Sequence, residues 1–121
     1  MTLSGWAVVF AADAIRDLSL IEDHLGSAYQ GFGEPPQDAQ RHAEARIDSI
    51  IATAERLTAA PLRGEPHDDL VPGLRHLTLD GAIYWFIPDA DLRVIRVLAI
   101  FVGGQDHQRH MLVRLLQRGA R

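Results

Sequence analysis

The stretch from Gly73 to Phe101 reads GLRHLTLDGAIYWFIPDADLRVIRVLAIF and decides the fold. It contains three runs rich in β-branched, aromatic and other apolar residues, at positions 73–79, 82–87 and 92–101. The dipeptide Asp80-Gly81 between the first two runs favours a type I′ hairpin, because both central residues of that turn need a positive φ. The stretch therefore predicts a three-stranded antiparallel meander.

The part of the chain before the meander predicts one strand and two helices. Residues 6–10 form a short β-type run with aromatic ends. A first helix should follow and end at Gly26, and a second should start at Pro35 or Pro36 and run to about Ala59. Each has an apolar stripe at helical spacing, made by Ala14, Leu18, Ile21 and Leu25 in the first and by Ala39, Ala43, Ile47, Ile50, Ala54 and Leu57 in the second. Two such helices can pack as a hairpin on one sheet face.

The C-terminal part predicts a covered central strand and a last helix. The run at 92–101 is apolar on both faces towards its end, which is typical of a central strand. A helix over residues 108–117 should begin after Asp106 as its N-cap and bury Met111, Leu112, Leu115 and Leu116. The expected fold is thus a single α+β domain, residues 1–121, with a small antiparallel sheet in the order β-α-α-β-β-β-α.

Composition narrows the function. The 121 residues include 12 basic residues, all arginine, and 16 acidic ones, which gives a net charge of −4. Such a chain has no overall positive field that would draw it to nucleic acid, so no direct sequence-specific nucleic-acid binding is expected. It has no cysteine. No apolar run approaches the ~20 residues of a membrane span, and no secretory signal is visible, so we expect a cytoplasmic protein without a membrane partner.

The order of elements resembles that of the RelE/ParE toxin superfamily, the toxins of bacterial type II toxin–antitoxin pairs, and is nearest to its ParE branch. Short local matches support the resemblance: Asp17-Leu18, Arg63-Gly64, Gly73-Leu74-Arg75, the Ile-Tyr-Trp-Phe strand and Gly103-Gly104-Gln105-Asp106-His107. The resemblance implies a curved sheet with the helical hairpin on one side. It also implies a cognate antitoxin, ParD-like, with a ribbon-helix-helix DNA-binding segment and a tail that wraps around the toxin.

The resemblance implies one of two toxic activities. ParE-like members poison DNA gyrase, cause growth arrest and serve in plasmid stabilisation, whereas RelE-like members cut messenger RNA on the ribosome. A metal-free ribonuclease needs a general base, fixed cations and a general acid. This chain has no lysine, and its tyrosines, Tyr29 and Tyr84, lie in an expected loop and an expected strand. We therefore favour a gyrase inhibitor that acts by binding, with a ribosome-dependent endoribonuclease and a degenerate, non-toxic antitoxin-binding module as alternatives.

The expected target-binding surface lies where the last strand ends. Its candidate residues are Arg75, Gln105, Asp106, His107, Arg109 and His110. If the chain were a nuclease, its catalytic residues would be Arg75, His107 and Arg109; otherwise none is expected.

No metal and no cofactor are expected. His107 and His110 have the i, i+3 spacing of helical metal ligands, but a capping Asp106 followed by surface histidines is the simpler interpretation. His67-Asp68-Asp69 is interpreted as a solvated turn, because no further ligand lies nearby in sequence. The aromatic residues Trp6, Trp85 and Phe86 are interpreted as core rather than as a platform for bases.

Overall fold

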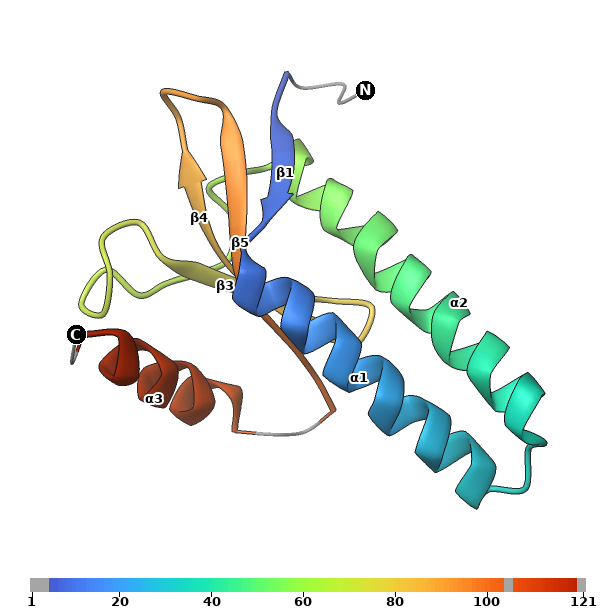
Figure 1. Ribbon diagram of the computed structural model, residues 1–121. Helices are drawn as coiled ribbons and strands as arrows, with labels where there is room; N and C mark the ends of the chain where they lie inside the picture. Colours follow the sequence, from blue (N-terminus) through green and yellow to red (C-terminus); the bar gives the residue numbers. More distant parts are fainter. Residues whose placement is uncertain (1–4, 104–105, 120–121) are drawn as a thin grey trace.

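The computed structural model of the protein, which describes residues 5–103 and 106–119, places helices on both faces of one sheet (Figure 1). The helical hairpin of α1 and α2 lies on one side of the strands and α3 lies on the other. A short 3-10 helix, η1, follows α2. The elements are β1 Ala7–Phe10, α1 Ala12–Gly31, α2 Pro36–Ala54, η1 Glu55–Ala59, β2 Glu65–Pro66, β3 Arg75–Leu79, β4 Ala82–Asp89, β5 Val94–Val102 and α3 His107–Gly119.

The five strands lie in the order β1-β5-β4-β3-β2. The predicted meander of β3, β4 and β5 is confirmed, and its strands pair antiparallel. The sheet as a whole is mixed rather than antiparallel, because β1 pairs parallel with β5. A two-residue strand, β2, also pairs with β3. It lies in residues 61–73, a stretch whose glycine and proline residues predict a loop. These pairings place β5 between β1 and β4, as the apolar pattern of its sequence predicts.

The turn between β3 and β4 has the backbone that its sequence predicts. Asp80 and Gly81 have φ values of 50° and 81°, so both central residues lie in the left-handed region. The guanidinium of Arg46 on α2 donates to the carbonyl oxygen of Asp80 at 2.9 Å, and that of Arg56 lies 3.1 Å from its carboxylate. The turn is therefore held against the helical hairpin as well as by its own geometry.

The larger apolar core lies between the sheet and the hairpin. The whole predicted α2 stripe is buried, and Ala14, Leu18 and Ile21 of α1 are buried with it. The helix α1 does not end at Gly26; it continues to Gly31. Its added turns pack on α2, where the ring of Tyr29 stacks on His42 with centroids 3.6 Å apart. Such tertiary contacts outweigh the roughly 1 kcal/mol that a helical glycine costs relative to alanine.

A smaller apolar cluster lies on the other face. Met111 of α3 packs there against Leu74, Ile83, Trp85 and Ala99. The helix starts as predicted, since the backbone N–H of Arg109 donates to the Asp106 carboxylate at 3.2 Å. Its apolar face is narrower than predicted, because Leu112 is 40% and Leu116 65% exposed. Among the described residues, no helix combines the length and hydropathy needed to span a bilayer.

A buried ion pair joins the two helical layers. Asp17 of α1 lies off the apolar stripe but is buried, and both its oxygens accept from the Arg114 guanidinium at 2.9 Å. One of these oxygens also accepts from the backbone N–H of Ile100 at 3.0 Å, beyond the point where β1 stops pairing with β5. The bond to Asp17 raises the pKa of Arg114. The Asp17 carboxylate thus satisfies a backbone N–H of β5 that β1 does not pair with, and it links α3 to α1.

Candidate functional site

Polar aromatic side chains gather on the sheet face that α3 covers. We define the histidine cluster as Glu65 of β2, His67 just after it, His76 of β3, Trp85 of β4 and His107 of α3. The side chains of His67 and His76 are only 12% and 13% exposed, whereas that of Glu65 is 59% exposed. The two imidazoles are therefore largely buried, and the Glu65 carboxylate lies at the solvent-exposed edge of the cluster.

Strand pairing explains why these residues meet. Glu65 is the direct partner of His76 across the β2–β3 pair, so their side chains share one face. His67 follows Glu65 by two residues and therefore lies on the same face. Gly64 permits the pairing, because it has a φ of 103° and a Cβ there would lie 2.6 Å from the carbonyl oxygen of His76. A close approach of two backbones thus sets the position of the cluster.

The polar atoms of three residues converge on one point. Nε2 of His67 lies 2.7 Å from Nδ1 of His76, a distance at which one nitrogen donates and the other accepts. Oε2 of Glu65 lies 3.3 Å from Nε2 of His67 and 3.5 Å from Nδ1 of His76. These three atoms are close enough together to hold a metal ion in common.

Trp85 forms the floor of the cluster. It is fully buried, and its ring centroid lies 4.6 Å from that of His67 and 4.8 Å from that of His76. Its indole N–H donates to Nδ1 of His107 at 3.2 Å, so Nδ1 of that ring acts as an acceptor. The ring of His107 also meets the ring of His76 edge-on at 4.7 Å. The orientations of all three imidazoles are therefore fixed by one buried tryptophan and by each other.

The surroundings of His76 favour its neutral form. Burial lowers the pKa of His76, and the neighbouring His107 and His67 lower it further, whereas the Glu65 carboxylate acts in the opposite direction. A neutral imidazole has a free lone pair on one nitrogen. His76 can therefore offer this lone pair to a hydrogen-bond donor or to a metal ion near neutral pH.

Of the described site residues predicted from the sequence, Arg75 lies apart from the others, which lie together at the start of α3. Arg75 lies on the opposite face of β3 from His76, and its guanidinium donates to the carbonyl oxygen of Gly64 at 3.3 Å. Arg109 is exposed, and so is His110, whose ring stacks on Phe101 at 6.0 Å.

The predicted surface includes two more residues. Asp106 is an exposed cap, and Gln105 lies outside the described residues. Among the described members of the predicted set, the structure brings only His107 into the histidine cluster.

Sequence reasoning missed Glu65, His67 and His76. His67 does begin a turn, since its carbonyl oxygen accepts from the N–H of Leu70 at 3.0 Å, but its side chain is not solvated. The available signal was the alternation Glu-x-His, which would place both side chains on one face of a strand. The interpretation of Trp85 and Phe86 as core is confirmed, because both are fully buried.

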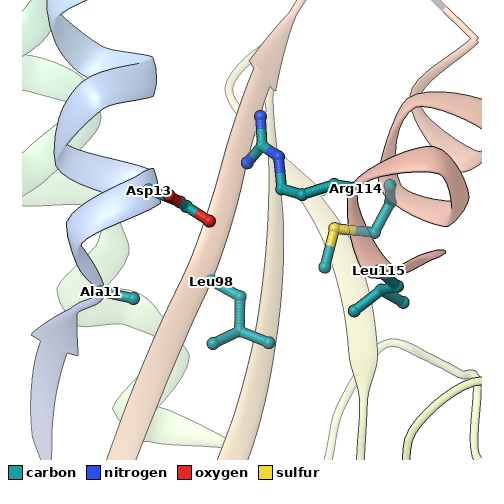
Figure 2. A pocket seen from close by; sticks show the side chains of 6 residues that line it. Ala11, Asp13, Leu98, Arg114 and Leu115 are labelled. Carbon is teal, nitrogen blue, oxygen red and sulfur yellow. The ribbon is translucent and has the colours of Figure 1, made fainter. Parts of the chain in front are cut away.

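Apart from the histidine cluster, a small hollow lies between the start of α1, β5 and α3. Figure 2 shows the side chains of Asp13 and Arg114 extending toward each other from the two helices. Its lining residues are Ala11, Asp13, Leu98, Met111, Arg114 and Leu115. No described candidate site residue is among them, and the hollow adjoins the ion pair of Asp17 and Arg114. We interpret it as a gap beside a structural contact.

Comparison with known proteins identifies the fold. No family model matches the chain, and no curated protein matches it. A solved structure described as the chromosomal ParDE TA system from P. aeruginosa contains a chain of similar shape, with a TM-score of 0.61 and 21% sequence identity. The match covers 82% of this chain and 97% of that one. The fold is therefore ParE-like, as the order of its elements led us to expect.

Proposed function

We propose that this protein is the toxin of a type II toxin–antitoxin module and belongs to the ParE branch. The observation that carries the proposal is the ParE-like fold, matched over nearly the full length of a chain from a ParDE system. Several local sequence matches of the RelE/ParE superfamily lie in described elements, with Asp17-Leu18 in α1 and the Ile-Tyr-Trp-Phe run in β4. Fold alone does not determine function, so we also propose a binding partner and a cellular target for this protein.

The proposed partner is a ParD-like antitoxin with a ribbon-helix-helix segment. Apolar side chains on the outer side of α3 support a protein partner: Leu112, Val113 and Leu116 are 40%, 46% and 65% exposed. A segment that folds on binding could cover such residues with its own apolar side chains. The antitoxin would then neutralise the toxin by occupying this surface.

The proposed target is DNA gyrase, and the proposed mode of action is binding rather than catalysis. A net charge of −4 gives no general attraction to a ribosome, whose surface is dominated by phosphate. Arg75 and Arg109, which a nuclease would need beside His107, lie on another face of the sheet and on an exposed helical turn. A toxin that holds gyrase on cleaved DNA would produce growth arrest without cutting any bond itself.

The test is inducible expression in a bacterial host, alone and together with the neighbouring reading frame. We expect the protein alone to arrest growth, to cause double-strand DNA breaks and to give filamentous cells. Co-expression of a neighbouring ribbon-helix-helix protein should restore growth and yield a stable complex on copurification. Unimpaired growth at high expression would instead identify a degenerate module that binds an antitoxin and poisons nothing.

A second candidate function, ribosome-dependent cleavage of messenger RNA, is favoured by the histidine cluster. Two imidazoles and a carboxylate can supply a general acid and a general base. In a translating extract, a nuclease would cut messages within codons, and His76→Ala would abolish the cuts. The gyrase inhibitor would leave messages intact in the same extract.

A further inference from the structure

We propose that Glu65, His67 and His76 form a binding site for a divalent transition metal of the zinc class. The two imidazole nitrogens and the carboxylate oxygen already face one another. None of the three ligands belongs to the expected target-binding surface, although His107 of that surface contacts the ring of His76. The metal site does not depend on the proposed toxin function. Two histidines and one glutamate form a common ligand set of zinc sites that keep one position open.

The distances between the donor atoms suit a tetrahedral ion. Zinc holds nitrogen and oxygen ligands at about 2.0–2.1 Å, so two ligand atoms of a tetrahedron lie about 3.3 Å apart. The carboxylate oxygen lies 3.3 Å from Nε2 of His67 and 3.5 Å from Nδ1 of His76. The two nitrogens lie 2.7 Å apart and would need to separate by about 0.6 Å. Small side-chain rotations are enough for that change.

The hydrogen bond between the two imidazoles is what a metal ion would replace. One proton lies between Nε2 of His67 and Nδ1 of His76, and both nitrogens lie within 3.5 Å of the same carboxylate oxygen. A nitrogen that binds a metal must be deprotonated, so an ion entering here binds both lone pairs while the shared proton moves, through solvent, to the other nitrogen of the ring that carried it. The Glu65 carboxylate adds the negative charge that a dication prefers.

Packing and strand pairing hold the three ligand side chains in place. The rings of His67 and His76 both pack on buried Trp85, and the β2–β3 pairing fixes Glu65 opposite His76. His107 contacts the ring of His76 and is itself held by the Trp85 N–H. Such outer contacts set ring orientation and commonly change metal affinity by about 10- to 100-fold.

The exposure of the three ligands shows how an ion would reach the site. The Glu65 side chain is 59% exposed and the two histidines are close to buried, so an ion can enter along the carboxylate. Three protein ligands leave the fourth position for water or for an atom of a bound partner.

The test is titration of the full-length, tag-free protein with Zn²⁺, followed by calorimetry. We expect one ion per chain. His67→Ala and His76→Ala should each weaken binding by at least about 100-fold, since loss of a ligand exceeds loss of an outer contact. Glu65→Gln, which changes an exposed side chain and should leave the fold intact, should weaken binding by about tenfold or more.

The matched control is His42→Ala. His42 also lies beside a glutamate, with its Nδ1 3.0 Å from Oε2 of Glu34, and it stacks on Tyr29, but its side chain is 52% exposed. This variant should bind Zn²⁺ as the unchanged protein does. Absence of binding at one ion per chain, or equal losses in the Glu65→Gln and His42→Ala variants, would overturn the proposal.

Co²⁺ gives a second readout. A tetrahedral Co²⁺ complex absorbs visible light far more strongly than an octahedral one, so a three-ligand protein site should produce an intense spectrum that Glu65→Gln weakens. A weak octahedral spectrum would count against the site. Neither measurement involves growth or gyrase. Absence of metal binding would therefore overturn the metal site and leave the proposed toxin function untouched. If the protein binds Zn²⁺ but does not impair growth, only the toxin function is overturned.

Discussion

The two faces of the sheet differ in what they bury. The hairpin face carries the larger core, in which Phe86, Tyr84 and Ile50 are fully buried among aliphatic side chains. The α3 face has a smaller apolar cluster and, beside it, three histidines and a glutamate around one tryptophan. Apolar burial stabilises a fold, whereas partly buried titratable groups are common at functional sites. We therefore expect the hairpin face to contribute most of the stability and the α3 face to carry any chemistry.

Truncation in each core should show the largest difference between the faces. Phe86→Ala should lower the free energy of unfolding by about 3–5 kcal/mol, because it leaves a cavity in the large core. Met111→Ala should cost about 2 kcal/mol, because α3 lies beside exposed surface and can settle into the gap. Urea denaturation of both variants measures this. A larger loss for Met111→Ala would contradict the proposed division between the faces.

Breaking the link between the layers should be the next largest effect. Asp17→Asn should cost about 3 kcal/mol, since it removes the charge that pairs with Arg114 in a partly dehydrated position. The control is Asp38→Asn, which breaks an exposed pair with Arg41 and should cost less than about 0.5 kcal/mol. Thermal unfolding compares the two. Similar losses would show that the Asp17 pair does not hold α3 to α1.

The hairpin face should also respond to alkaline pH through Tyr84. Its hydroxyl donates to the carbonyl oxygen of Ile50 at 2.6 Å, and burial raises the pKa of Tyr84 to about 12. Below pH 10 the tyrosine is protonated in both folded and unfolded chains. Between pH 10 and 12 only the unfolded chain loses the proton, so stability should fall by roughly 2–3 kcal/mol.

The matched variant for this pH effect is Tyr84→Phe. It should be about 1 kcal/mol less stable at pH 7, because the Ile50 carbonyl loses its hydrogen-bond donor. Its stability should then fall less steeply above pH 10 than that of the unchanged protein. Parallel alkaline curves for the two proteins, measured by urea denaturation, would contradict the assignment to Tyr84.

The smallest expected effect is on the α3 face. Trp85→Phe keeps an aromatic floor but removes part of a fully buried ring and the N–H that donates to His107, at a cost of roughly 1–2 kcal/mol. Amide hydrogen exchange should become faster in the first turn of α3 and stay unchanged in α1. Uniformly faster exchange would mean that Trp85 acts mainly through the core.

Prediction from the sequence succeeded where the signal is local. The Asp80-Gly81 turn, the α2 stripe and the Asp106 cap each depend on a few neighbouring residues, and each is confirmed. The sequence predicts that α1 ends at Gly26, five residues before its end at Gly31, because packing on α2 continues the helix past its local stop signal. The expected functional surface shares only His107 with the histidine cluster. Arg75 and His76 are neighbours in β3, so their side chains lie on opposite faces of the sheet. His76, not Arg75, lies on the face that carries the histidine cluster.

The sequence by itself determined the order of the elements, the hairpin turn and the helical stripes, because periodicity and backbone preference act over a few residues. Only the tertiary structure decided the parallel pairing of β1 with β5, the short strand β2 and the ion pair between Asp17 and Arg114. It also decided that Glu65, His67 and His76 meet over Trp85. These features join residues that are distant in the chain, and their positions are set by strand register and by the packing of helices on both faces.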